Sequence, residues 1–91
     1  MTLQRGGFRR YDEDRMVALF TMTDDSAEIG CAISSEAMDS LDGSKGTKPA
    51  AREDQFLRHR DRIEACAARK FSAAEFEGRP PGLILRSIDF R

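Results

Sequence analysis

The chain has 91 residues, of which 40% are hydrophobic and 34% are charged, a composition typical of one small folded domain and not of a disordered chain. Its 15 Lys and Arg against 16 Asp and Glu give a net charge of −1, which excludes a general attraction to nucleic acid or to an anionic membrane. The longest purely apolar run, residues 16–20, is too short to cross a bilayer, and the N-terminus lacks the apolar run of a signal peptide. We therefore expect a cytoplasmic protein that binds any charged partner through a local patch.

Residues 1–15 are expected to form an extended N-terminal arm, followed by a single domain over residues 16–91. The arm is rich in Arg, Asp and Glu, and its side chains able to pack on the domain are Leu3, Phe8 and Tyr11. A short edge strand near Phe8 is the one regular element that we expect there.

Two apolar segments, residues 16–22 and 27–33, flank a polar stretch with two Asp and one Ser, and this pattern predicts a β-hairpin. Closing the turn around Asp24 and Asp25 determines which residues face each other. The expected pairs on the core face are Phe20 with Ile29, Ala18 with Cys31, and Met16 with Ile33.

The opposite face of this hairpin is also apolar, because it carries Val17 and Leu19 beside Ala32. An apolar character on both faces predicts that residues 16–22 form a central strand, with the last strand of the chain beside it. One helix layer cannot cover both faces. We therefore expect Phe8 or Tyr11 of the arm, or a second subunit, to cover the second face, and Val17 and Leu19 are candidate interaction residues.

A short helix capped by Ser34 or Ser35 is predicted over residues 36–41, and a solvated loop follows it. Residues 49–74 contain no interrupting Gly or Pro after Pro49, and their apolar residues recur at helical spacing. This segment predicts one long amphipathic helix. Its buried stripe consists of Phe56, Ile63, Ala67 and Ala74.

A Gly- and Pro-rich stop at residues 78–82 is followed by a β-compatible segment, residues 83–88. The expected element order is therefore β, β, α, α, β. We predict an α+β fold in which a small antiparallel or mixed three-stranded sheet has the long helix packed on one face.

Three arginines share the outer side of the predicted long helix. They are Arg58, Arg62 and Arg69, with Arg52 and Lys70 on the flanks of the stripe. Such a stripe can contact phosphates or an acidic protein, but Asp54 and Asp61 stand at spacings that favour helical ion pairs. A solvated face is the simpler interpretation, and a nucleic-acid surface is the alternative.

Arg60 differs from these three because helical geometry places it at the edge of the buried side, beside Phe56 and Ala67. Its guanidinium is expected to bind a carboxylate, either Glu64 one turn later or an acid from elsewhere. Its expected role is structural.

The two cysteines, Cys31 and Cys66, lie in apolar contexts, and His59 is the single histidine. This set cannot supply four zinc ligands without carboxylates, so both thiols are expected to be buried and unreactive. His59 and Cys66 are about 10 Å apart along a helix axis and cannot pair. Cys31 is able to approach His59, but no oxyanion site is visible. We therefore expect no catalysis, cofactor or metal.

Three segments in this order carry a family resemblance: EIGCAIS at residues 28–34, FLRHRDRIE at residues 56–64, and LRSIDF at residues 85–90. The chain resembles small bacterial proteins of domain-of-unknown-function family 1488 over about residues 8–91. The resemblance implies a compact α+β domain with no assigned activity, substrate or cofactor. The residues that match the family's pattern, without a known role, are Cys31, His59, Arg60, Glu64 and Asp89.

The doubly apolar strand and the charged helix face together favour a binding or regulatory module that acts through protein–protein contacts. Its expected partner is an unknown protein or a second copy of the chain, and we expect no membrane contact. The alternative is a nucleic-acid-associated protein that uses the face formed by Arg58, Arg62 and Arg69.

Overall fold

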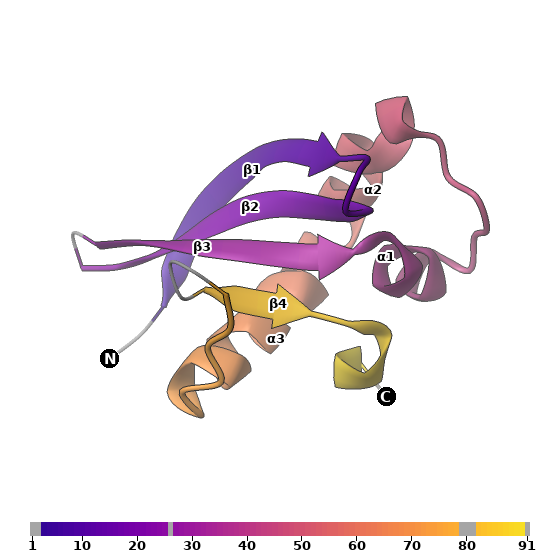
Figure 1. Cartoon of the computed structure of the whole chain (residues 1–91). Coiled ribbons are helices and arrows are strands. Elements are labelled where there is room, and N and C mark those ends of the chain that lie inside the picture. Colours follow the sequence, from indigo (N-terminus) through magenta and orange to yellow (C-terminus); the bar gives the residue numbers. More distant parts are fainter. Residues whose placement is uncertain (1–2, 26, 79–81, 91) are drawn as a thin grey trace.

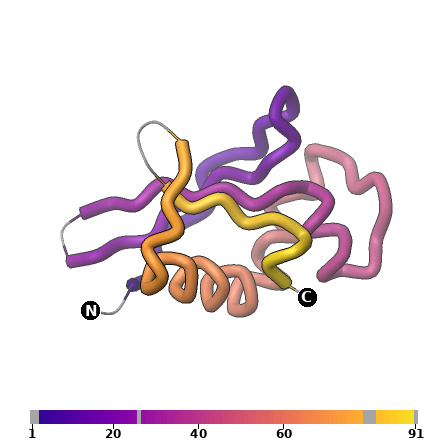
Figure 2. The backbone as a smooth tube through the Cα atoms, turned by 60° about the horizontal axis from the view of Figure 1, so that its bottom comes forward, coloured from indigo at the N-terminus to yellow at the C-terminus, as the bar shows by residue number. Residues whose placement is uncertain are grey.

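A computed structural model describes residues 3–25, 27–78 and 82–90 of the chain. Four strands form one mixed sheet in the order β1-β2-β3-β4, and the helices lie against one of its faces (Figures 1 and 2). The predicted α+β fold is confirmed, with one strand more than expected. The strands are β1 (Gln4–Asp12), β2 (Val17–Asp24), β3 (Ala27–Ser34) and β4 (Leu83–Leu85).

The additional strand, β1, comes from the expected N-terminal arm. The edge strand expected near Phe8 is present, but it is nine residues long and belongs to the sheet of the domain. It pairs with β2 in an antiparallel arrangement, with Phe8 opposite Phe20 and Tyr11 opposite Ala18. Both aromatic side chains pack against the core on the helix side of the sheet. Phe8 and Tyr11 therefore do not cover the second face of the sheet. Of the two covers that we expected there, the N-terminal arm was wrong, and a second subunit stays a prediction.

The β2–β3 hairpin has the expected faces but not the expected pairs. Phe20 lies opposite Cys31, and Met22 lies opposite Ile29, two residues away from the predicted register. A shift of two residues keeps every side chain on its face. The reason for this register is burial. It places Met22 in the core, where it is 2% exposed, whereas Met16 lies outside the strand and is 58% exposed.

The last strand, β4, runs parallel to β3, with Ala32 beside Ile84. We expected it beside residues 16–22, but β1 already occupies that side of β2. A parallel neighbour requires a long crossover connection, which the helical segment between β3 and β4 supplies.

Three α-helices occupy this crossover. Helix α1 begins after Ser34, whose hydroxyl oxygen accepts a hydrogen bond from the Ala37 backbone N–H at 3.1 Å. The predicted long helix is interrupted at His59, which has φ −112° and ψ 16°. The helices are α1 (Ser35–Asp42), α2 (Arg52–Arg58) and α3 (Arg60–Ser72), and short 3₁₀ turns span Pro49–Ala51 and Ser87–Phe90.

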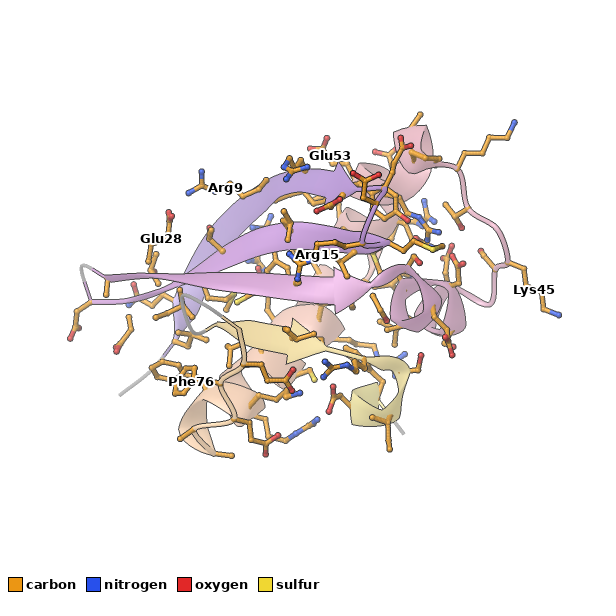
Figure 3. The ribbon with its side chains drawn as sticks, viewed as in Figure 1. Arg9, Arg15, Glu28, Lys45, Glu53 and Phe76 are labelled. Carbon is orange, nitrogen blue, oxygen red and sulfur yellow. The ribbon has the colours of Figure 1, made fainter. Side chains whose placement is uncertain are left out.

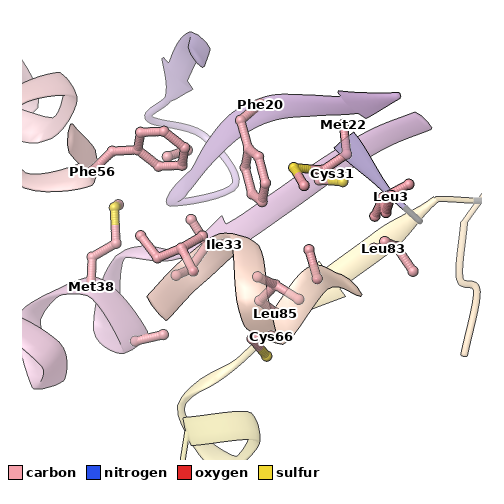
Figure 4. Packing of buried hydrophobic residues seen from close by; sticks show 14 residues of the cluster. Leu3, Phe20, Met22, Cys31, Ile33, Met38, Phe56, Cys66, Leu83 and Leu85 are labelled. Carbon is pink, nitrogen blue, oxygen red and sulfur yellow. The ribbon is translucent and has the colours of Figure 1, made fainter. Parts of the chain in front are cut away.

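The core lies between the sheet and the helices (Figure 4). The ring of Phe56 packs at 5.0 Å from the ring of Phe20 and at 5.4 Å from that of Phe8, measured between centroids. Phe56, Ile63 and Ala67 are buried as predicted, whereas Ala74 lies beyond the end of α3 and is exposed. No helix in the described residues is long and apolar enough to span a membrane.

Candidate functional site

The sheet face that points away from α2 and α3 is not covered by any helix in the described residues (Figures 1 and 2). It contains a shallow hollow of about 780 Å³, which we call the outer groove. The strands β2, β3 and β4 form its floor, because alternate side chains of each strand point away from the core. The floor consists of Leu19, Thr21, Gly30, Ala32 and Ile84.

Charged side chains surround the outer groove (Figure 3). On the β1 side, Arg9 forms an ion pair with Glu28 of β3, so these two charges compensate each other. Arg10 lies 3.9 Å from a carboxylate oxygen of Asp12. Arg15, in the turn between β1 and β2, has no ion-pair partner among the described residues. The β1 side of the groove therefore carries the less compensated positive charge.

On the β4 side of the groove, the charges of the described residues Glu77 and Arg86 compensate each other. Two oxygens of Glu77 accept hydrogen bonds from Arg86, at 3.0 Å and 2.8 Å. These hydrogen bonds hold the pKa of Glu77 below its ordinary value. A bidentate pair of this kind favours the charged forms of both groups.

A second polar site, formed by α1, α2 and the loop between them, is partly buried. Asp39 accepts hydrogen bonds from Thr47 at 2.7 Å, from Arg52 at 2.8 Å and from Gln55 at 2.9 Å. Partial burial alone raises the pKa of Asp39, but these three hydrogen bonds outweigh it and lower the pKa. Arg52 is 3% exposed, and its guanidinium also lies over the ring of Tyr11. The expected position of Arg52 on an exposed helix flank was therefore wrong.

His59 contacts the same region through a different carboxylate. Its Nε2 lies 2.8 Å from Asp42 Oδ1 at the end of α1. Asp42 also accepts hydrogen bonds from Ser44 and Arg58, and this set of partners, His59 first, lowers its pKa. The contact holds the junction of α2 and α3 against α1. It joins His59 to a carboxylate and not to a thiol, so the described residues contain no Cys–His pair.

The fold and these sites allow comparison with known proteins. Residues 5–82 match the model of a family described as a protein of unknown function, DUF1488. The chain belongs to the DUF1488 family. A search of curated proteins finds no match to this chain.

A solved structure supports the same assignment of fold. The crystal structure of a protein of unknown function from the DUF1488 family of Shewanella loihica PV-4 is similar to this DUF1488 protein, with a TM-score of 0.76. The two sequences are 20% identical, and the similarity covers 91% of this chain and 94% of the other. At this identity the likeness shows the fold alone.

Two of the family-pattern residues in this DUF1488 protein, Arg60 and Glu64, link α3 to β1. Arg60 Nε donates to Glu64 at 2.8 Å, and Arg60 Nη2 donates to the carbonyl oxygen of Gly6 at 3.1 Å. Arg5 Nε donates to the other oxygen of Glu64 at 2.7 Å. Arg60 thus lies at the edge of the buried side of α3. It binds Glu64, the carboxylate one helical turn later that the sequence predicted.

Replacing Arg60 with alanine is expected to lower the free energy of unfolding by about 1–3 kcal/mol, because it removes a half-buried hydrogen-bonding network. Arg62, two residues away on the exposed side of α3, is the matched control, and its alanine variant should change stability by about 0.5 kcal/mol or less. Urea denaturation of both variants measures the difference. Equal midpoints for the two variants would contradict the role given to Arg60.

The other family-pattern residues are also engaged within the fold. Burial raises the pKa of the Cys31 thiol to about 12, and burial likewise raises the pKa of Cys66. Both thiols are buried, as expected from their apolar surroundings. Asp89 accepts a hydrogen bond from Lys70 at 3.1 Å and one from the Arg86 backbone N–H at 2.8 Å. Lys70 is therefore buried and not on an exposed flank.

The three stripe arginines of this DUF1488 protein are not equivalent. Arg58 belongs to α2 and forms an ion pair with Asp42 at 2.8 Å. Arg69 donates to the backbone carbonyl oxygen of Asp89 at 2.7 Å. Arg62 is exposed and has no ion-pair partner among the described residues. The helix break at His59 therefore separates residues that a continuous helix would have aligned.

Periodicity and charge patterns did not indicate the buried Arg52–Asp39–Gln55 contacts. These residues are 13 and 16 positions apart across a loop, so no local spacing joins them. The rim of the outer groove was not predicted for a similar reason, because Arg9 meets Glu28 only when β2 pairs with β1 on one side and with β3 on the other.

Proposed function

We propose that this DUF1488 protein is a small binding module that acts through protein–protein contacts made at the outer groove. The observation that carries the proposal is an apolar floor on a sheet face that no described helix covers. Leu19 and Ile84 are half-buried there, on either side of Ala32. An apolar floor with a charged rim is typical of a surface that contacts another protein.

The hydrogen bonds of the charged groups also favour the outer groove as the contact surface. The side chains around Asp39 and Asp42 are already bonded to these two carboxylates. At the outer groove, by contrast, Arg15 has no ion-pair partner among the described residues, and Arg10 is held only by the long 3.9 Å contact with Asp12. A partner that places apolar side chains on Leu19 and Ile84 gains from burial, and the two arginines favour one orientation.

The alternative, nucleic-acid binding through Arg58, Arg62 and Arg69, has less support. Two of these guanidinium groups already have acceptors within the chain, and one exposed arginine gives little electrostatic attraction to a phosphate backbone. A salt-dependent shift of mixed nucleic acid, lost in the Arg62→Ala variant, would favour the alternative over our proposal.

The proposal is tested by site-specific photo-cross-linking in the native host cells. A photoreactive amino acid is introduced at Leu19 in the outer groove and, as the matched control, at Arg62 on α3. We expect a protein adduct from the Leu19 position and none from the Arg62 position. Adducts from Arg62 alone, or from neither position, would overturn the proposal.

A further inference from the structure

One row of side chains crosses all four strands on the outer face of the sheet. Arg10 of β1 pairs with Leu19 of β2, and Leu19 pairs with Ala32 of β3. Ala32 in turn lies beside Ile84 of β4. All four residues line the outer groove. The row is therefore apolar from β2 to β4 and ends in a guanidinium group at β1.

The dimensions of this row suit a short segment of a partner chain. Neighbouring strands lie about 4.8 Å apart, so the apolar part from Leu19 to Ile84 spans about 10 Å and Arg10 stands about 5 Å beyond it. Leu19 and Ile84 are half-buried, and each keeps apolar surface that a partner can bury. A segment that lies across the strands can therefore cover the row and place a polar group at Arg10.

The carboxylates of the groove are already compensated. The described lining contains Glu28 and Glu77. Glu28 forms an ion pair with Arg9, and Glu77 binds Arg86 through both of its oxygens. Lysine or arginine side chains of a partner would have to displace these arginines. The groove therefore favours a partner that is not cationic.

Two guanidinium groups of the same rim are less engaged. The side chain of Arg10 is 65% exposed, and its ion-pair contact is the one with Asp12 at 3.9 Å. Arg15 is exposed near the turn between β1 and β2 and has no ion-pair partner among the described residues (Figure 3). Glu13 and Asp14, in the same turn, lie outside the described lining of the groove. Guanidinium groups bind carboxylates in a bidentate geometry, so the complementary group is a carboxylate.

A phosphate backbone also carries anionic oxygens, but it fits this surface less well. The apolar side chains of the described floor are aliphatic, whereas bases of single strands stack on aromatic rings. The net charge of −1 gives no general attraction to a nucleic acid. The apolar row and the two arginines together favour a protein.

We infer that the occupant of the outer groove is an acidic segment of another protein that lies across the strands. Its apolar side chains cover Leu19 and Ile84, and its carboxylates bind Arg10 and Arg15. This inference rests on the proposed function, since it names the chemistry of the partner at the same surface.

The first experiment measures the preference of the groove directly. A phage-displayed library of random short peptides is selected on the immobilised wild type and, in parallel, on the double variant Arg10→Glu/Arg15→Glu. We expect the wild type to enrich Asp and Glu beside apolar residues, and the double variant to enrich Lys and Arg in their place. Arg62→Glu, which reverses an exposed charge on α3, is the control and should select the same peptides as the wild type. Circular dichroism checks that the variants remain folded.

The second experiment uses the partner in the host cells. The photoreactive amino acid at Leu19 is combined with Arg10→Glu/Arg15→Glu or with the control Arg62→Glu. The double substitution should lower the yield of the Leu19 adduct on the order of tenfold, because carboxylates then repel each other, and the control should not change it. Mass spectrometry of the cross-linked peptide should find Asp or Glu close to the adduct.

Peptides without an excess of Asp and Glu, the same peptides from the double variant, or no enrichment at all would each overturn the inference. A Leu19 protein adduct whose yield the double substitution leaves unchanged, or one that contains a second copy of this chain, overturns the inference but leaves the proposed function standing. A Leu19 adduct that a nuclease removes overturns both. The absence of any adduct from Leu19 overturns the proposed function, and the inference with it.

Discussion

Replacing Arg52 with alanine is expected to lower the free energy of unfolding by about 3–5 kcal/mol, because it removes a buried guanidinium and leaves the carboxylate of Asp39 without its cationic partner. Arg52 is 3% exposed and bonds to Asp39 at 2.8 Å and to Gln55 at 2.7 Å. Its guanidinium also packs 5.2 Å from the centroid of the Tyr11 ring. The substitution therefore weakens contacts among α1, α2 and β1 together. Urea denaturation measures the loss.

The matched control for Arg52 is Arg58, which lies in the same helix and also binds a carboxylate of α1, Asp42. Arg58 is exposed, so its alanine variant should lose about 1 kcal/mol or less. A larger loss of stability for Arg52→Ala than for Arg58→Ala would identify burial of the guanidinium as the cause. A loss at Arg58→Ala that equals the loss at Arg52→Ala would contradict this account of the polar site.

Truncation of Phe56 to alanine should also cost about 3–5 kcal/mol, as is usual for a buried aromatic side chain. Phe56 is fully buried, and its ring packs against Phe8 of β1 and Phe20 of β2. The cavity would lie where α2 meets two strands. Thermal and urea denaturation both measure the effect.

The neighbouring Leu57 provides the control for Phe56, because it belongs to the same helix and is 44% exposed. Its alanine variant should change stability by about 0.5 kcal/mol or less. Comparable destabilisation by the two variants would indicate that the buried face of α2 is assigned incorrectly.

The elements that local patterns predicted are those stabilised by residues close together in the chain. Ser34 caps α1 through an amide three positions away, and the buried positions Phe56, Ile63 and Ala67 follow the period of a helix. The hairpin faces were correct despite the wrong register, because a shift of two residues preserves the alternation of side chains. The apolar second face of β2 was also predictable, since Val17 and Leu19 alternate with Ala18 and Phe20.

The features decided by tertiary structure depend on partners distant in sequence. Strand β1 contains two glycines and several arginines, and it becomes a strand because the free edge of β2 supplies its hydrogen bonds. Helix α2 ends at Arg58 in the structure, although no local residue requires it, and the next residue, His59, bonds to Asp42.

Amino-acid sequence by itself thus determined the fold class, the buried cysteines and the apolar character of both sheet faces. Tertiary structure decided the position of β4 beside β3, the burial of Arg52 and the shape of the outer groove. The physical reason is the same in each case. Periodicity and capping act within a few residues, whereas strand order, buried ion pairs and surface shape depend on side chains that only folding brings together.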